Sequence, residues 1–327
     1  MSDTTVKRAG VRLGVTYQLA LFLLLVFLVV FFGVIQPVFF DPDVFFNVTA
    51  IIGEIGIMAL AMTFIITTGG IDLSVGYNLQ LCAIVFGSVY ARTHNVAEAT
   101  ALAVLCGIAC GFLNGLIISR TKIPPLVTTL ATMNLYRGIS MIVAGSQTYA
   151  GFPASFKAIS TTELFGIVPI QFIYYLVLFM IFGLFYAKGT LGRNLKGIGF
   201  NENVLVFSGI NTKRTLLFIY TLAGLMCAGA SLIYLGRLSA ATTSMGNDLN
   251  LQVITAVVLG GTSIMGGIGS ISGTFIGTLI IGVLRKGFTL LNFSGNIFNF
   301  TLGVILIVAL IAFALLEERK KTHRARQ

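Results

Sequence analysis

The stretch "TAIIGEIGIMALAMTFIITTGGIDLSVG" (residues 49–76) joins a long apolar run to a glycine-rich turn that carries an acid and a hydroxyl. The run over 49–68 has the length of a helix that crosses the roughly 30 Å hydrocarbon core of a bilayer. The pair Gly69-Gly70 ends this run, and Asp72 and Ser74 are residue types that cap a following helix. The stretch therefore predicts a membrane helix, a tight turn and a second helix.

The whole chain has the composition of a membrane protein. Of its 327 residues, 56% are hydrophobic and 10% are charged, and the mean hydropathy is +0.96, whereas soluble domains carry about 25% charged residues. Helices satisfy the backbone in lipid, so we expect an all-α polytopic fold with eight to ten transmembrane helices. The ten candidate spans lie near 17–36, 49–68, 75–92, 99–118, 126–144, 168–187, 216–235, 250–265, 270–287 and 297–316.

Basic residues predict the orientation, because cytoplasmic loops are rich in lysine and arginine. With ten spans, four basic clusters fall on one side: the tail 1–16, the turn with Arg120 and Lys122, the segment 188–214 and the tail 317–327. Both termini are therefore expected in the cytoplasm. The basic residues that give the chain its net charge of +10 flank the predicted membrane spans. This distribution argues against nucleic-acid binding.

A second glycine cluster, "GGTSIMGGIGSISG" (residues 260–273), suggests an internal repeat of the kind found in transporters. Setting Gly69-Gly70 over the pair at 260–261 places Gly76 over Gly267, an offset of 191 residues. The cluster lacks the lysine and hydroxyl residue that end a phosphate-binding loop, so no nucleotide site is predicted. The predicted glycine turns comprise Gly69, Gly70, Asp72, Ser74, Gly76, Gly260, Gly261, Gly266 and Gly267.

The polar segment 188–214 contains "NENVLVFSGI" (residues 201–210), which predicts a short amphipathic helix. Asn201 or Glu202 would cap it, and Ser208-Gly209 would end it. Its apolar face would consist of Val204, Leu205 and Phe207. Two interpretations remain open: a helix lying on the membrane surface, or a docking helix for a cytoplasmic partner.

Four ordered stretches carry a family resemblance. They are "TTGGIDLSVG" (67–76), "KIPPLVTTLATMNLYRGIS" (122–140), "GRNLKGIGFNENVLVFSGI" (192–210) and "AVVLGGTSIMGGIGSISGTFIG" (256–277). Together they closely resemble the permease subunits of bacterial ABC importers for ribose, galactose, xylose or arabinose. The resemblance implies a single permease domain over 1–327, in the bacterial inner membrane. It also implies a cytoplasmic ATP-binding subunit, a periplasmic sugar-binding protein and a second permease subunit.

The same resemblance places the ATPase-contacting coupling helix at 201–210. The family has alanine and threonine where Asn203 and Val204 stand. Neither a catalytic group nor a cofactor is implied, and ATP hydrolysis is expected only in the partner. Polar residues on the predicted spans are candidates for the translocation path: Asn78, Gln80, Asn114, Thr128, Thr129, Asn134 and Arg137.

Several alternatives stay open. An ion-coupled secondary carrier would need intramembrane acids, and Glu54 lies within a predicted span. Asp72 either caps a helix or pairs with a charge such as Arg137. Cys106 and Cys110 lie four residues apart on one helix face; buried thiols are the ordinary interpretation of this pattern and a metal or redox pair is the alternative.

Overall fold

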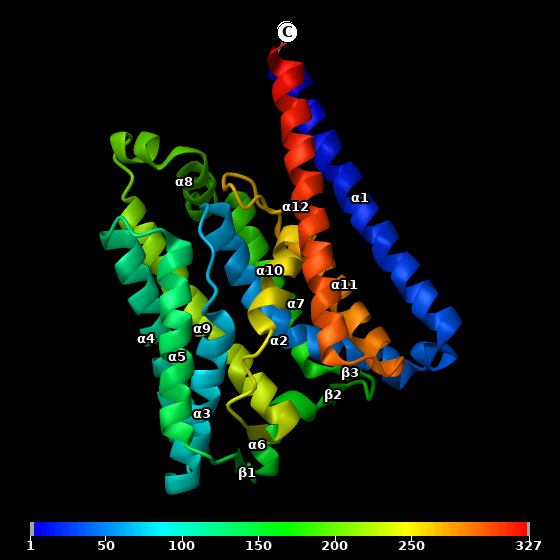
Figure 1. Ribbon diagram of the computed structural model, residues 1–327, viewed down its shortest axis with the longest axis vertical. Coiled ribbons are helices and arrows are strands. Elements are labelled where there is room, and N and C mark those ends of the chain that lie inside the picture. Colours follow the sequence, from blue (N-terminus) through cyan, green and yellow to red (C-terminus); the bar gives the residue numbers. More distant parts are fainter. Residues whose placement is uncertain (1–2, 326–327) are drawn as a thin grey trace.

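A computed structural model describes the backbone of residues 3–325 and the side chains of residues 17–311. The side chains of the two expected tails, 1–16 and 317–327, lie outside the described residues. The described chain is almost entirely helical, as predicted (Figure 1). In order, the elements are α1 (Asp3–Ile35), η1 (Pro37–Phe40), α2 (Pro42–Thr67), α3 (Val75–Thr93), α4 (Val96–Arg120), α5 (Pro125–Ala144), β1 (Tyr149–Ala150), α6 (Ala154–Thr161), β2 (Glu163–Leu164), β3 (Val168–Pro169), α7 (Ile170–Lys188), α8 (Thr190–Phe207), α9 (Thr212–Leu238), β4 (Ala240–Ala241), α10 (Leu249–Leu259), α11 (Ile271–Leu290) and α12 (Gly295–Ala325).

Each of the ten predicted spans coincides with one helix. Within the described residues, seven helices are long and apolar enough to cross a membrane: α1, α2, α4, α5, α7, α9 and α11. The helix α3 is long enough, but Asn78 and Gln80 lower its hydropathy. The eighth predicted span, 250–265, was too long, because α10 ends at Leu259 where Gly260 and Gly261 turn the chain.

The long helix α2 forms the centre of the bundle. Most of its apolar window is buried, whereas α1 is mostly exposed. It packs against α7, α9, α10 and α11, and α1 and α12 reach away from the other helices at one end of the molecule (Figure 1). A helix that is apolar all round is expected at such a central position.

Close backbone contact between α4 and α9 depends on glycines. Gly107, Gly111 and Gly115 lie four residues apart on α4, and Gly111 faces Gly224 of α9. A Cβ atom added at Gly111 would stand 2.3 Å from the carbonyl oxygen of Tyr220. Small residues at this spacing allow membrane helices to approach closely.

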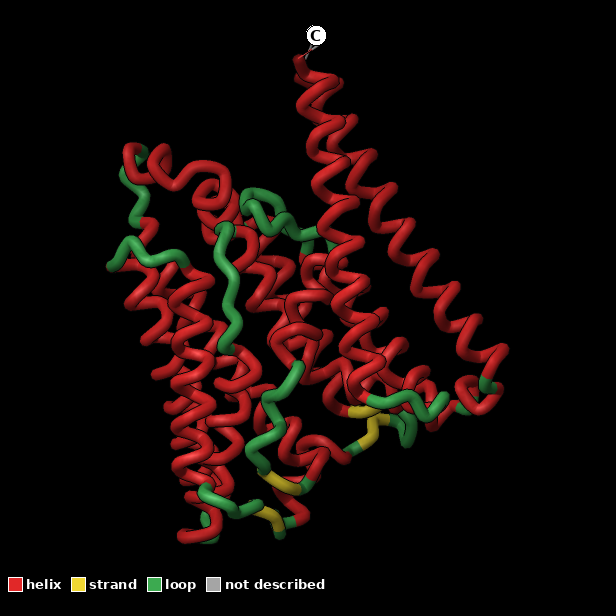
Figure 2. The backbone as a smooth tube through the Cα atoms, viewed as in Figure 1, coloured by secondary structure: helices red, strands yellow, loops and turns green. Residues whose placement is uncertain are grey.

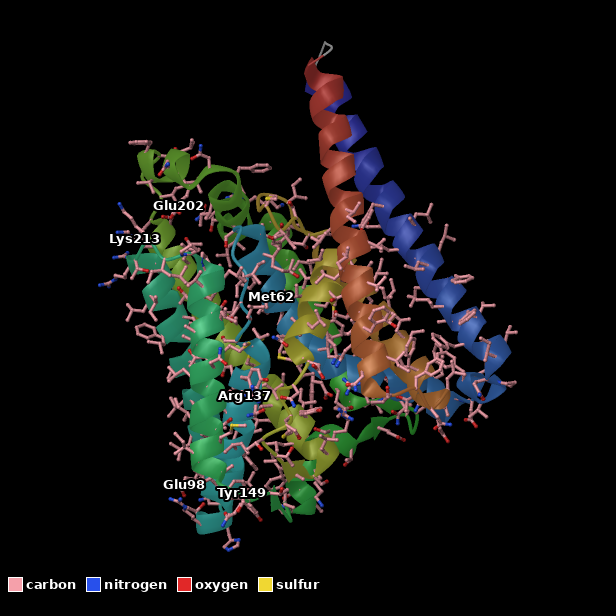
Figure 3. All side chains as sticks on the ribbon, viewed as in Figure 1. Met62, Glu98, Arg137, Tyr149, Glu202 and Lys213 are labelled. Carbon is pink, nitrogen blue, oxygen red and sulfur yellow. The ribbon has the colours of Figure 1, made fainter. Side chains whose placement is uncertain are left out.

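The predicted basic clusters with described side chains share one end of the bundle. Figure 3 places Glu202 and Lys213 at this end and Glu98 at the opposite end. The opposite end also carries the antiparallel pair of β1 with β4, in which Tyr149 lies opposite Ala241, and the pair of β2 with β3.

Candidate functional site

Two of the helices begin inside the bundle rather than at its surface. The chain leaves α2, runs through residues 68–74 without helical structure and starts α3 at Val75. A second irregular segment, 242–248, leads from β4 to the start of α10 at Leu249. Figure 2 shows both segments as loops that run between the surrounding helices. Irregular backbone at this depth is tolerated where protein surrounds it.

The two interrupted helices meet at their N-terminal ends. A Cβ atom on Gly76 would stand 2.6 Å from the carbonyl oxygen of Gly246, and a Cβ atom on Gly246 would stand 2.6 Å from that of Gly76. The backbone N–H of Gly246 donates to Gln80 Oε1 at 3.1 Å, and Asn250 Nδ2 donates to the carbonyl oxygen of Leu73 at 3.4 Å. Paired half-helices of this kind surround the substrate sites of several transporter folds.

Asp72 organises the first irregular segment. Its Oδ1 accepts hydrogen bonds from the backbone N–H of Ser74 at 2.8 Å and from the Ser74 hydroxyl at 2.6 Å. Asn114 Nδ2 donates to Ser74 Oγ at 2.8 Å and more weakly to Asp72 Oδ2 at 3.4 Å. The hydroxyl of Tyr136 donates to Asn114 Oδ1 at 3.1 Å. Asp72 is therefore buried among neutral hydrogen-bond donors.

This geometry corrects two expectations about the turn. Asp72 does not pair with Arg137, which lies exposed on α5 with its guanidinium 5.7 Å from the centre of the Tyr77 ring. Ser74 is the residue before α3, but its side chain makes no capping hydrogen bond. Asp72 instead closes a local turn with Ser74.

The candidate path residues separate into two groups. Gln80, Asn78, Asn114, Thr128 and Thr129 are buried. Gln80 donates to the Ser140 hydroxyl at 2.5 Å, and Thr129 Oγ1 donates to the carbonyl oxygen of Ile71 at 2.9 Å, so both tie α5 to the interrupted segment and to α3. Thr128 Oγ1 is buried without a hydrogen-bond partner. Most buried polar groups in proteins are hydrogen-bonded, so Thr128 is an exception among these residues.

Asn134 and Arg137 form the second group, exposed residues of α5 of which Arg137 lies beside Tyr77 of α3. Both side chains are exposed, and Asn134 Nδ2 donates to the carbonyl oxygen of Leu130 on its own helix at 2.9 Å. Apolar Leu135 and Ile142 are exposed on the same helix. An arginine on a membrane helix requires water or protein beside it.

The structure pairs two charged residues that sequence reasoning left separate. Arg237 of α9 donates from Nη2 to Oε1 of the fully buried Glu54 on α2, and from Nε to Oε2 at 3.4 Å. The Arg237 guanidinium also lies 5.1 Å from the centre of the Tyr234 ring. The intramembrane acid of α2 is therefore neutralised by a neighbouring cation.

The predicted short helix at 201–210 is present as the second half of α8. The backbone at Asn201 leaves helical geometry (φ −166°, ψ 102°), and its Oδ1 accepts from the backbone N–H of Asn203 at 3.1 Å. The predicted Asn201 cap is thus confirmed. Gly209 has φ +78°, and the N–H of Ile210 donates to the carbonyl oxygen of Leu205 at 3.0 Å, which confirms the predicted stop.

The apolar face of this short helix differs from the prediction in one respect. Leu205 is half-buried and faces Gly197 of the first half of α8. Val204 and Phe207 are exposed, together with Val206, which the sequence analysis did not single out. Phe207 is 91% exposed, so the short helix presents an apolar surface away from the bundle.

The first half of α8 contacts both predicted glycine turns. A Cβ atom on Gly199 would stand 2.1 Å from the carbonyl oxygen of Thr67 and 2.1 Å from the backbone nitrogen of Gly267. The N–H of Gly267 donates to the carbonyl oxygen of Thr67 at 2.8 Å. We call these three residues with Gly266 the glycine junction, because they join α8 to the end of α2 and to the turn between α10 and α11 through backbone contacts.

The two glycine turns share a helix-ending hydrogen-bond pattern, but the predicted offset of 191 was wrong by one residue. Gly69 (φ +81°) and Gly261 (φ +86°) hold the equivalent left-handed positions. The N–H of Gly70 donates to Ile65 and that of Thr262 donates to Val257, each across five residues. Gly260 is still helical in φ and ψ and therefore corresponds to Thr68.

The family described as "Branched-chain amino acid transport system / permease component" matches residues 44–310. The autoinducer 2 import system permease protein LsrD of Escherichia coli (strain SMS-3-5 / SECEC) is 35% identical over 306 residues, covering 92% of each chain. The Shigella flexneri protein of the same name is 34% identical with the same coverage. No solved structure matches the chain. The chain therefore belongs to this family of ABC importer permease components.

Proposed function

We propose that this chain forms the translocation path of an ABC importer for a small, sugar-like solute of monosaccharide size. The two relatives named above are permeases for autoinducer 2, a sugar-like molecule. The polar groups around the interrupted helices are mostly amides and hydroxyls, and the buried acid and arginine, Glu54 and Arg237, neutralise each other. A path of this chemistry suits a neutral, hydroxyl-rich solute.

The observation that carries the proposal is the exposed second half of α8. Phe207, Val204 and Val206 are apolar side chains directed away from the bundle at the end where Lys213 also lies (Figure 3). An aromatic residue at the centre of an apolar patch is the usual anchor of a protein interface. We assign this surface to the cytoplasmic ATP-binding subunit, with Glu202 and Asn201 at its edge and Ser208 and Gly209 at its end.

The end of the bundle that carries the second half of α8 also indicates how the chain is oriented in the membrane. Basic residues favour the cytoplasmic side, so the α8 end faces the cytoplasm of a bacterial inner membrane and both termini lie there. The opposite end, with α6 and the short strands, then faces the periplasm. It is the side on which a periplasmic binding protein would deliver the solute.

A second permease subunit is proposed to cover the exposed side of α5. Arg137 and Asn134 are exposed on this helix, and the Arg137 guanidinium lies beside the Tyr77 ring of α3. Lipid would leave the guanidinium without water or a counter-charge, at a cost of about 2.5–3.5 kcal/mol at the centre of a helix. A partner subunit or a water-filled path beside α5 removes this cost.

The ion-coupled carrier is less well supported than the ABC importer. Such a carrier needs an intramembrane acid that gains and loses an ion or proton. Of the two buried acids among the described side chains, Glu54 is paired with Arg237 and Asp72 is held by Ser74 and Asn114. Neither acid is free for a coupling ion.

Reconstitution tests the proposal directly. The chain is assembled in proteoliposomes with its ATP-binding subunit and binding protein, and uptake of labelled D-ribose, D-galactose, D-xylose, L-arabinose and autoinducer 2 is measured. We expect uptake of at least one solute that requires ATP hydrolysis. Uptake that an ion gradient drives without ATP would favour the secondary carrier instead.

A further inference from the structure

A cavity of about 240 Å³ lies between α10, α11 and α12. Its polar lining includes Asn247, Asp248, Gln252, Arg285 and Asn299. Pockets for drug-sized ligands enclose about 300–1,000 Å³, so this cavity suits a smaller solute. None of these lining residues is among the predicted path residues.

The polar lining supplies donors and acceptors without net charge. Three of the five side chains are amides, each of which both donates and accepts hydrogen bonds. The formal charges of Asp248 and Arg285 cancel. Arg285 Nη1 already donates to Gln252 Oε1 at 3.0 Å, which fixes the guanidinium across the cavity and leaves its other N–H groups to donate.

One wall of the cavity is aromatic. Phe288, Phe293 and Phe298 all line it. The ring of Phe288 lies 5.3 Å from that of Phe293 and 6.0 Å from that of Phe298, both edge to face. A mainly apolar lining with a few polar groups is typical of a small-molecule site.

The cavity adjoins the meeting point of the two interrupted helices. Asn247 and Asp248 end the irregular segment 242–248, directly before α10. Asn247 Oδ1 accepts a hydrogen bond from the hydroxyl of Tyr77, in the first turn of α3, at 3.2 Å. The other side of the cavity is formed by the turn between α11 and α12, which lies at the end opposite α8 (Figure 1).

We infer that this cavity is a binding site for the transported solute on the delivery side of the membrane, and that it takes a small uncharged ring bearing several hydroxyl groups. The inference rests on the proposed function and adds the location and residues of the site. Hydroxyls bond the three amides, Asp248 and Arg285, while the C–H face of the ring packs against the phenylalanines. L-Leucine carries one ammonium and one carboxylate group and has no hydroxyl, so it lacks the set of hydroxyls that this polar lining would bond.

The absence of tryptophan from the sequence provides a direct binding assay. Phe293→Trp places a single tryptophan in the cavity wall. The full-length variant in nanodiscs is titrated with D-ribose, D-galactose, D-xylose, L-arabinose, autoinducer 2 and L-leucine, and its fluorescence is recorded. We expect a saturable change with at least one of the sugar-like solutes and none with L-leucine.

Two further substitutions in the tryptophan background locate the contact. Arg285→Gln and Asn299→Ala should each weaken the apparent Kd about tenfold or more, the loss expected for a hydrogen bond to a charged or buried group. Lys286→Gln is the matched control, because Lys286 is the next residue on α11 and does not line the cavity. It should leave the apparent Kd unchanged.

The outcomes separate this inference from the proposed function. A response to L-leucine alone, no saturable response, or a response that neither substitution weakens overturns the assignment of the cavity. ATP-driven uptake without a fluorescence response supports the proposed importer and contradicts the assignment of the cavity. A fluorescence response without ATP-driven uptake supports the assignment of the cavity and contradicts the proposed importer.

Discussion

Arg237 of α9 and Glu54 of α2 form an ion pair between residues that are 183 positions apart in the chain. Glu54 is fully buried and Arg237 is one-quarter exposed. Breaking a buried ion pair by removing one partner leaves an uncompensated charge, which costs about 3–5 kcal/mol. The pair therefore fixes the packing of α9 against the central helix.

We expect Arg237→Gln to lower the unfolding midpoint strongly, because it leaves the buried Glu54 carboxylate without a cation. The double variant Glu54→Gln/Arg237→Gln should be more stable than Arg237→Gln alone, since no charge remains buried. Thermal unfolding of the purified chain in detergent measures both. A double variant that is less stable than either single variant contradicts the ion-pair assignment.

The glycine junction gives a second prediction. A Cβ atom at Gly199 would collide with the backbone of Thr67 and Gly267, so Gly199→Ala should displace α8 from the end of α2 and from the turn between α10 and α11. Contact with the ATP-binding subunit is expected to persist, because the exposed second half of α8 is unchanged. Solute-stimulated ATPase activity in the assembled complex should fall.

The matched control for Gly199→Ala is Gly229→Ala. Gly229 lies within α9, and a Cβ atom added there meets no atom within 4 Å. Alanine favours a helix over glycine by about 0.5–1 kcal/mol, so Gly229→Ala should leave activity intact and stability equal or higher. Equal ATPase stimulation in both variants means that the glycine junction does not transmit motion.

The turn at Asp72 gives a third prediction. Asp72→Asn keeps an oxygen that accepts from Ser74, but places a second amide group against Asn114 Nδ2. Asp72→Ala leaves the buried backbone N–H and the hydroxyl proton of Ser74 without an acceptor, which costs about 1–3 kcal/mol. Stability and uptake should therefore decrease in the order wild type, Asp72→Asn, Asp72→Ala.

Arg137→Gln provides the comparison for the Asp72 variants. Arg137 does not contact Asp72, so the destabilisation by Asp72→Asn should be the same in the wild-type and Arg137→Gln backgrounds. Residues without shared partners are additive to within about 0.3–0.5 kcal/mol. A larger coupling energy between the two positions is evidence of the charge pair that the structure lacks.

Local sequence patterns predicted those features that depend on neighbouring residues. The helices α2 and α9 follow from long apolar runs, and the short helix after Asn201 follows from its cap, apolar residues and glycine stop. The correct alignment of the two glycine turns could be determined only from the backbone angles. Either of two adjacent glycines can adopt the left-handed conformation, so the sequence does not show which one does. Gly69 holds it in one pair and Gly261, the second residue, in the other.

Features formed by segments that lie far apart in the chain could not be predicted from the sequence. The sequence indicated Glu54 as an intramembrane acid but not its partner Arg237, since nothing local indicates which cation reaches a buried acid. The cavity draws on residues near 247–252, 285–289 and 293–299, each a short polar interruption of an apolar region. Only packing of α10, α11 and α12 brings them together.

The last prediction concerns the exposed end of α8. Phe207 is 91% exposed, so Phe207→Asp removes no packing within the chain and should leave the permease folded and inserted. An aspartate in the middle of an apolar docking surface would be desolvated without a partner, which is strongly unfavourable. We expect Phe207→Asp to reduce co-purification of the ATP-binding subunit and to abolish uptake, and Glu202→Ala to have a smaller effect.

Phe165→Asp is the matched control, because Phe165 is 90% exposed and lies in the turn between β2 and β3. If Phe207→Asp retains the ATP-binding subunit and full uptake, as Phe165→Asp should, the second half of α8 is an interfacial helix and the ATPase contacts another surface.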